Sequence, residues 1–281
     1  MPDRTLLLII LYFTSLLSCT ESKTQPEGSL YIIGGGKRPP EMVKEMMTLS
    51  GADKDGTIVI LPMASAEPDT SAYYASSQFM EQGAEKIEVL KLDNNDLTMQ
   101  ERSALLNASL VYIPGGSQAR FMDTLENTDI AATLMTAYRG GAMIAGTSAG
   151  AAVQSELMIT GDQHFHSEYT GYFRSIEANN IVTIPGLGFL KNTLIDQHFI
   201  KRQRLNRLIS ACIDHPDFMG IGIDESTAIH VKDGIARVSG LSQVIVLECP
   251  EENIQVKDGL QGVSGMQLSV YLPGESFEIY K

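Results

Sequence analysis

The strongest chemical signal in the sequence is a serine surrounded by very small residues. Residues 144–151 read Ile-Ala-Gly-Thr-Ser-Ala-Gly-Ala, so Gly146, Ser148 and Gly150 have the Gly-x-Ser-x-Gly spacing of a nucleophile elbow. A nucleophile on a sharp strand-to-helix turn needs strained backbone angles and neighbours without bulk. The helix that follows such a turn directs free backbone N–H groups at an oxyanion. We therefore predict a nucleophilic Ser148, and the alternative is a glycine-rich turn with an incidental serine.

A serine hydroxyl is a weak nucleophile, and it needs a base whose pKa lies near the working pH. The chain has five histidines. His215 precedes a proline in an expected turn, and His230 alternates with apolar residues in an expected strand, which favours structural roles for both. His198 follows an apolar stretch and precedes a run rich in basic residues. It is the best candidate for the base.

The base in turn needs a carboxylate on its far ring nitrogen. Asp224 and Glu225 follow the apolar strand expected at 219–223, and a carboxylate at a strand end beside small residues is well placed for this role. The alternative is a solvated acidic pair in a turn. In an α/β-hydrolase the acid precedes the histidine, whereas here it follows. This order resembles that of the glutamine-amidotransferase-like class of α/β folds.

Two further patterns could bind cofactors, and the sequence argues against both. His164 and His166 have no cysteine or third histidine with ligand spacing, so we expect a loop at the site mouth rather than a metal site. The glycine run 34–36 lacks the G-x-G-x-x-G spacing of a dinucleotide site. We expect no metal and no other cofactor. Cys212 and Cys249 lie in no reactive motif and are interpreted as structural, with their pairing left open.

The order of apolar and periodic segments predicts an α/β fold. Continuous apolar strands alternate with helical stretches, which indicates a three-layer sandwich with a mainly parallel central sheet covered on both faces. Ligands of such sheets bind beyond the carboxyl ends of the strands. Strands are expected at 30–33, 57–61, 87–92, 110–113 and 142–145, and helices at 39–49, 69–82, 98–106, 117–126 and 129–139.

After the serine turn the expected organisation changes. Residues 157–180 show no clear periodicity and are predicted to form a loop against the site. From Met219 onward the chain reads as short strands and antiparallel hairpins, with a turn signal at Asp233-Gly234. A chain of 281 residues, 43% of them hydrophobic, can bury one sizeable core. We therefore expect a single domain over residues 29–281.

Four motifs together resemble the cyanophycinases and their dipeptidase relatives. They are the Gly-Thr-Ser-Ala-Gly-Ala run around Ser148, the Gly-Gly-x-Gln loop that ends at Gln118, the Asp-Gln-His-Phe run that starts at Asp196, and the Gly-Ile-Asp-Glu run that ends at Glu225. The resemblance covers about residues 29–250. It implies a serine peptidase of family S51 on a class I glutamine-amidotransferase-like, flavodoxin-like α/β fold.

The resemblance also implies a role for each matching residue. Ser148 would be the nucleophile, His198 the general base and acid, and Glu225 the residue that orients the histidine. The backbone N–H groups of Gly116 and Ala149 would form the oxyanion hole. The residues implied to hold the substrate are Gln118, Asp196, Gln197, Arg202, Arg204 and Arg207.

The three arginines of this set constrain one another. On one straight helix Arg202, Arg204 and Arg207 would spread over more than half of the circumference, so they can face one ligand only if the segment before Leu205 is a loop. Guanidinium groups bind carboxylates through two parallel hydrogen bonds. Cyanophycin, the substrate of the family, is a polyaspartate with arginine on each β-carboxyl, so every unit presents an arginine α-carboxylate. The alternative is a solvated basic helix start.

The resemblance therefore implies a serine exopeptidase that hydrolyses cyanophycin to β-Asp-Arg dipeptides. One alternative is an aspartyl or isoaspartyl dipeptidase of the same family, and another is a non-catalytic binding protein on this fold. A homodimer is also implied. The net charge of −13, without a basic stripe, argues against a nucleic-acid partner.

The first residues predict export and a lipid anchor. The apolar run 6–13 is too short to span a bilayer comfortably and fits a signal peptide. Residues 16–19, Leu-Leu-Ser-Cys, resemble a bacterial lipobox, which implies a signal peptide over 1–18, lipid on Cys19 and a polar tether over 19–28. We thus expect an exported protein on the periplasmic or cell-surface side, held to a bacterial membrane by lipid only. The alternatives are an ordinary signal peptide and a retained anchor helix.

Overall fold

The computed structural model describes residues 28–279 apart from positions 94, 167 and 169–172. The expected signal peptide, Cys19 and almost all of the expected tether lie outside the described residues. Within the described ranges, no helix is both long and apolar enough to cross a membrane. Helices pack on both faces of a large, mainly parallel sheet, which confirms the predicted fold class.

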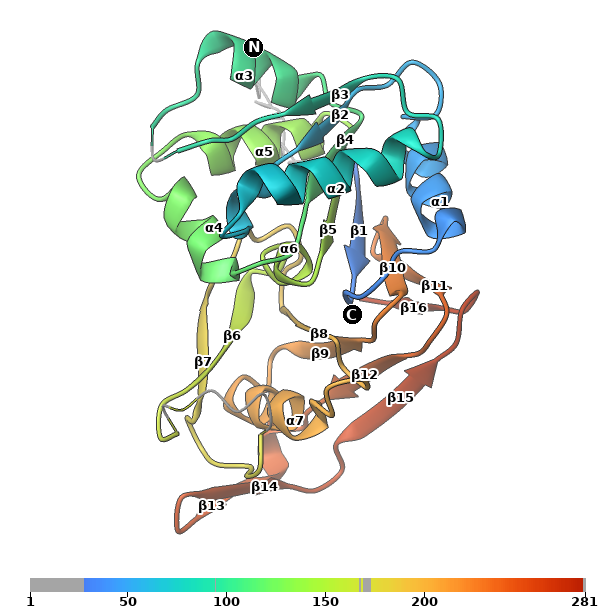
Figure 1. The fold of residues 1–281 in the computed structure, drawn as a ribbon. Helices are drawn as coiled ribbons and strands as arrows, with labels where there is room; N and C mark the ends of the chain where they lie inside the picture. Colours follow the sequence, from blue (N-terminus) through green and yellow to red (C-terminus); the bar gives the residue numbers. More distant parts are fainter. Residues whose placement is uncertain (1–27, 94, 167, 169–172, 280–281) are drawn as a thin grey trace, which may run out of the picture.

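Five parallel strands form one side of the main sheet, with β3 at its edge (Figure 1). All except β3 are buried along their whole length, because helices cover both faces. This double burial explains why the strands read as continuous apolar runs. In spatial order they are β1 (Ser29–Ile33), β5 (Met143–Thr147), β4 (Leu110–Ile113), β2 (Ile58–Ile60) and β3 (Ile87–Val89).

Three antiparallel strands extend this sheet beyond β1. They are β10 (Thr227–Lys232), β11 (Ile235–Gly240) and β16 (Ser276–Glu278), with β10 beside β1 and β16 at the edge. Asp233 and Gly234 connect β10 to β11 with φ values of 51° and 78°. A type I′ hairpin turn needs a positive φ at both central positions, so the expected turn is confirmed.

Six helices cover the two faces of the main sheet. One face packs on methionines of α1 and on Phe79 of α2, and the other packs on the remaining four helices. The first pair is α1 (Pro40–Ser50) and α2 (Pro68–Met80), which lie in front of the sheet in Figure 1. The others are α3 (Met99–Leu106), α4 (Gln118–Leu125), α5 (Ile130–Arg139) and α6 (Ala149–Ala152).

A second sheet, which the sequence analysis did not foresee, lies beyond the carboxyl ends of β1 and β5 (Figure 1). It has the order β15-β12-β9-β8, and α7 (Leu205–Asp214) packs on it. The backbone of His198, which follows β8, bonds to Gly34, which follows β1. The strands are β8 (Thr193–Gln197), β9 (Met219–Ile223), β12 (Val244–Glu248) and β15 (Gln267–Tyr271).

The loop expected over 157–180 is only partly correct. Its first residues form β6 (Leu157–Gln163), which pairs with β7 (Ile181–Pro185) as an antiparallel hairpin. The pairing register shifts between Ile159 and Gln163. A bulge of this kind breaks the regular alternation of apolar and polar residues, which is why the strand gave no clear sequence signal. The remaining short elements are η1 (Pro62–Ala64), η2 (Glu251–Asn253), β13 (Ile254–Lys257) and β14 (Leu260–Val263).

Candidate active site

Ser148 lies in the sharp turn between β5 and α6. Its φ of 55° is in the left-handed region, which non-glycine residues rarely adopt. The Ser148 N–H donates to the Ile33 carbonyl at 3.0 Å, and its own carbonyl accepts from the N–H groups of Ala151 and Ala152, each at 3.0 Å. The strained turn is therefore held by backbone bonds to β1 and to the first turn of α6.

The glycines around the serine are required by close backbone contacts. A Cβ at Gly146 would lie 2.1 Å from the carbonyl oxygen of Gly150, and a Cβ at Gly150 would lie 2.0 Å from that of Ile113. Backbone atoms cannot move aside as a flexible side chain can. The small residues of the sequence motif thus allow β5, α6 and β4 to meet closely enough to form the elbow.

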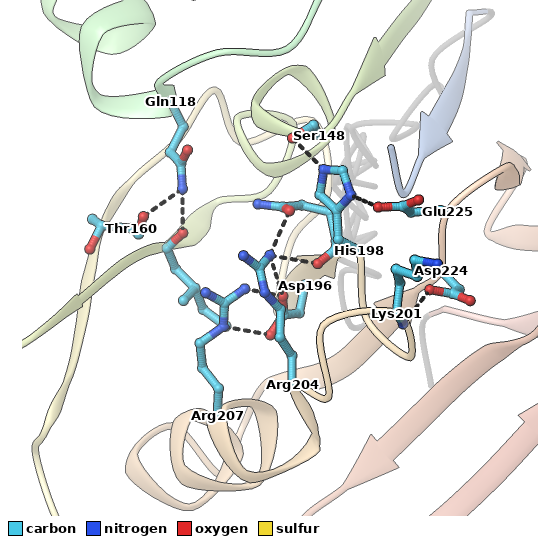
Figure 2. A network of polar contacts seen from close by, with 12 residues as sticks. Gln118, Ser148, Thr160, Asp196, His198, Lys201, Arg204, Arg207, Asp224 and Glu225 are labelled. Carbon is cyan, nitrogen blue, oxygen red and sulfur yellow. Dashed lines mark hydrogen bonds and ion pairs between the residues drawn. The ribbon is translucent and has the colours of Figure 1, made fainter. Parts of the chain in front are cut away.

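His198 connects the serine to a carboxylate (Figure 2). Its Nε2 lies 3.0 Å from Ser148 Oγ, and its Nδ1 lies 2.7 Å from Glu225 Oε1. The structure therefore selects Glu225 rather than Asp224 as the partner of the ring. Asp224 instead accepts hydrogen bonds from the Lys201 N–H at 2.9 Å and the Ser242 hydroxyl at 2.9 Å, so it holds the loop that follows His198.

The surroundings of His198 favour its neutral form. Burial lowers the pKa of the ring, and the positive charges of Arg202 and Arg204 lower this pKa further. The hydrogen bond to Glu225 acts in the opposite direction without reversing the result. A neutral ring can accept the proton of the Ser148 hydroxyl, as a general base must.

The two expected oxyanion-hole groups border the serine. A Cβ at Gly115 would lie 3.3 Å from the Ser148 Cβ, which places the Gly115-Gly116 turn directly against the nucleophile. Gly116 has a φ of 152°, and its own Cβ would lie 2.1 Å from the Ala64 carbonyl oxygen. Ala149 is the first residue of α6, where an N–H has no partner within the helix. The Gly115-Gly116 turn and Ala149 thus lie beside the nucleophile, and the role of the Gly116 and Ala149 N–H groups as the oxyanion hole stays a prediction.

Four of the expected substrate-binding residues form one buried network (Figure 2). Arg207 Nε donates to Asp196 at 2.8 Å, and Arg207 NH2 bonds the other oxygen of the same carboxylate. Arg204 NH1 donates to the Gln197 carbonyl at 2.6 Å and to its side-chain oxygen at 2.7 Å, and it lies 3.7 Å from Asp196. Two guanidinium groups therefore share one carboxylate next to His198. The Arg207 guanidinium also lies 5.0 Å from the centre of the Phe173 ring.

The structure separates the three arginines by exposure. α7 begins at Leu205, so the segment that carries Arg202 and Arg204 is not helical. The three arginines therefore do not lie on one straight helix, which was the condition for them to face one ligand. Arg204 and Arg207 are nevertheless 3% and 2% exposed, whereas Arg202 is on the surface. Because its charge acts on the His198 ring, Arg202 is the one of the three with both solvent access and a position near the triad.

Gln118, the last member of the expected set, joins two elements beside the site. Its side-chain Nε2 donates to the carbonyls of Ile159 at 2.9 Å and Thr160 at 2.8 Å (Figure 2). These bonds fasten the start of α4 to β6. The structure thus shows Gln118 as a link between the oxyanion loop and the hairpin, and its role toward the substrate stays a prediction.

The glycine run after β1 packs against the triad. A Cβ at Gly35 would lie 2.3 Å from His198 Cε1, and a Cβ at Gly36 would lie 2.8 Å from Glu225 Cβ. Both glycines have positive φ values, of 112° and 70°. The place of the run at the carboxyl end of a parallel strand indicates a ligand site, but its contacts with the His198 ring and with Glu225 do not follow from the sequence.

The remaining candidate side chains lie apart from this cluster. His166 Nε2 pairs with Glu177 at 2.8 Å on the β6–β7 hairpin. Among the described residues, no group of three or more His, Cys, Asp or Glu side chains is arranged to hold a metal ion. Cys212 and Cys249 are both free, and burial raises the pKa of the Cys212 thiol, which disfavours the reactive thiolate.

The α/β fold and the Ser148, His198 and Glu225 contacts define a serine peptidase. The chain belongs to peptidase family S51, whose family model matches residues 30–239. The cyanophycinase of Trichormus variabilis is 35% identical over 230 residues, which are 79% of this chain and 74% of the relative. The cyanophycinase of Geminocystis herdmanii is 32% identical over 232 residues, or 78% of this chain and 80% of the relative.

Two solved structures share the fold. A peptidase from an acI-B1 Actinobacterium superposes with a TM-score of 0.63 at 22% identity, over 90% of this chain and 98% of that structure. A putative peptidase E protein from Listeria monocytogenes gives a TM-score of 0.53 at 15% identity, over 76% and 99% of the two chains. At these identities the similarity concerns the fold alone.

Proposed function

We propose that this peptidase hydrolyses cyanophycin and releases β-Asp-Arg dipeptides. The observation that carries the proposal is the arginine network beside His198, in which Arg204 and Arg207 share the Asp196 carboxylate. Positive charge concentrated there suits the arginine α-carboxylate that every cyanophycin unit presents. Because Arg202 is exposed, its guanidinium can contact that carboxylate directly. The buried Arg204 and Arg207 act on the substrate through their charge alone. The cyanophycinase relatives support the same substrate.

The triad geometry supports an acyl-enzyme mechanism. Ser148 Oγ attacks a backbone carbonyl carbon of the aspartate chain while its proton passes to His198 Nε2, 3.0 Å away. Glu225 stabilises the imidazolium that forms, and the N–H groups of Gly116 and Ala149 bind the oxyanion. When the C–N bond breaks, His198 returns the proton to the leaving amine. A water molecule then gives a proton to His198 and attacks the acyl carbon, and His198 returns that proton to Ser148 Oγ as the ester bond breaks.

The direct test is to incubate the purified protein with insoluble cyanophycin and to follow the products by mass spectrometry. A Ser148→Ala variant serves as the control, because it lacks only the nucleophile. Release of β-Asp-Arg by the wild type alone would support the reaction, the nucleophile and the substrate together. If no dipeptide appears although a serine-reactive probe labels Ser148, the protein is a peptidase of small aspartyl peptides instead.

We also propose that the protein is exported and held to a bacterial membrane through lipid on Cys19, on the strength of the lipobox-like run 16–19. Metabolic labelling with a fatty acid should tag the wild type and not a Cys19→Ala variant. Labelling of both, or of neither, would contradict the anchor. The homodimer implied by the family resemblance is proposed on that basis alone, and light scattering of the purified protein would test it.

A further inference from the structure

The loop between β1 and α1 encloses one side of the triad. The Gly34 N–H donates to the Thr227 carbonyl at 2.9 Å, and the Ser226 N–H donates to the Gly35 carbonyl at 2.9 Å. The Ser226 hydroxyl donates to the Lys37 carbonyl at 2.7 Å. These three bonds join the glycine run to the segment that carries Glu225. The residues that follow the run are therefore held at a defined place on the Glu225 side of the triad.

Arg38 is the fixed cation at the end of this loop. Its Nε donates to the side-chain oxygen of Gln78 at 2.5 Å, and its NH1 donates to the Gly36 carbonyl at 3.1 Å. Both acceptors are neutral, and within the described residues Arg38 forms no ion pair. The Nε2 of Gln78 is also buried and without a hydrogen-bond partner among the described residues. The junction between α2 and the β1–α1 loop therefore has more hydrogen-bond donors than acceptors.

The charge distribution around the triad differs from that of the whole chain. The sequence has 34 acidic and 21 basic residues, yet one Lys-Arg pair follows the glycine run that packs on the His198 ring, and another follows His198 itself closely along the chain. Lys37 and Arg38 come after the glycine run, and Lys201 and Arg202 come after His198 itself. In Figure 2, Glu225 lies on the side of the His198 ring away from Arg204 and Arg207. Guanidinium groups therefore flank the triad on two sides.

We propose that Arg38 binds a second substrate carboxylate, on the Glu225 side of the triad, so that the site accommodates several units of the polymer. The inference rests on the proposed function and specifies which part of the polymer is recognised. A guanidinium held by two neutral acceptors is already oriented, and its remaining N–H donors can bind a carboxylate without further ordering. The Arg202 side of the site binds one arginine α-carboxylate, and Arg38 binds that of a unit beyond the two that flank the cleaved bond.

The test compares synthetic oligomers of the aspartate chain that carry arginine on every β-carboxyl and contain two or four units. For the wild type we expect kcat/KM to be about tenfold higher for the four-unit oligomer, since one charge-assisted contact has this order of magnitude. Arg38→Gln should abolish the gain by raising KM for the longer oligomer, with kcat unchanged. The two-unit oligomer should be cleaved equally by both proteins.

Lys37→Gln is the matched control, because it removes the same charge from the adjacent exposed residue and should keep the gain. Gln78→Met keeps the charge of Arg38 but frees the side chain, so it should lose part of the gain. A merely structural role for Arg38 would lower the melting temperature in Arg38→Gln and Gln78→Met and leave the dependence on length unchanged, and that result would overturn the inference. Failure of the wild type to cleave either oligomer would instead overturn the proposed function.

Discussion

The protonation of His198 depends on a small number of nearby charges. Burial and the positive charge of Arg202 both lower the pKa of the ring, so the free enzyme keeps a neutral base to pH values below the usual histidine range near 6.5. Because only the neutral ring can take the Ser148 proton, kcat/KM should fall as the pH decreases through this lowered pKa.

Replacing Arg202 with glutamine should move that acid limb to higher pH. Removal of a positive charge stabilises the protonated ring and so raises the pKa of His198. The measurement is the pH profile of kcat/KM on a small peptide substrate. Lys201→Gln is the control, because it removes the neighbouring charge and should leave the limb in place. An equal shift in both variants would show that overall charge, rather than Arg202, sets the pKa.

The adjacent carboxylates of Asp224 and Glu225 have different hydrogen-bond partners, so mutating each one shows which of them orients the His198 ring. Glu225→Gln should reduce kcat by about 10³–10⁴-fold, because an amide in place of the carboxylate disfavours the reactive ring tautomer and the imidazolium. Asp224→Asn should have a much smaller effect, since Asp224 bonds Lys201 and Ser242 rather than the ring. Steady-state kinetics and melting temperatures of both variants check this, and an Asp224→Asn loss as large as that of Glu225→Gln would contradict it.

At the scale of elements, the β1–α1 loop positions the triad by close contact. Gly35→Ala should abolish most of the activity, since the new Cβ would lie 2.3 Å from the His198 ring at a φ of 112°. Gly51→Ala is the control, because Gly51 also has a positive φ, of 76°, but its Cβ would meet nothing within 4 Å. We expect Gly51→Ala to cost about 1 kcal/mol of stability and no activity. The kinetics and melting temperatures of both variants decide this, and an active Gly35→Ala protein would exclude the loop from the site.

Elements with a local signal could be predicted from the sequence alone. The strand expected at 110–113 has the bounds of β4, and the helix expected at 98–106 differs from α3 by one residue at its start. A doubly covered parallel strand is a continuous apolar run, and an N-cap such as Thr98 marks a helix start. Neither signal depends on what the element packs against. The bulged strand β6 lacked such a signal and was taken for a loop.

The site was predictable to the extent that its geometry is local. The Ser148 turn follows from glycine spacing, because the steric requirement lies within a few residues. The choice between Asp224 and Glu225 did not follow from the residues, since it depends on which side chain faces the ring. The burial of Arg207 was also out of reach. It depends on the assembly of β8, β9, β12 and β15 into a second sheet, and the pattern of the single strands does not show that assembly.

At the scale of the whole molecule, the buried His198 and the half-buried His215 and His230 link stability to pH. Burial lowers the pKa of His198, His215 and His230 below the value that each has in the unfolded chain. The unfolded state therefore binds more protons than the folded state in this range. The stability that these rings contribute is present above about pH 6.5 and is lost as the pH falls through their lowered pKa values.

His230 offers the cleanest test of this linkage, because it lies away from the triad and its Nε2 is buried without a partner in the described part of the chain. We expect the free energy of unfolding in urea to decrease from pH 7 to pH 5, and His230→Gln to reduce that decrease by removing one titrating ring. His166→Gln, at an exposed ion pair with Glu177, is the control and should keep the full decrease. This pH range is distinct from that of the partly exposed Glu156 and Glu177, whose lowered pKa values place their contribution at more acidic pH. An unchanged dependence in His230→Gln would mean that the buried ring is not what the acid titrates.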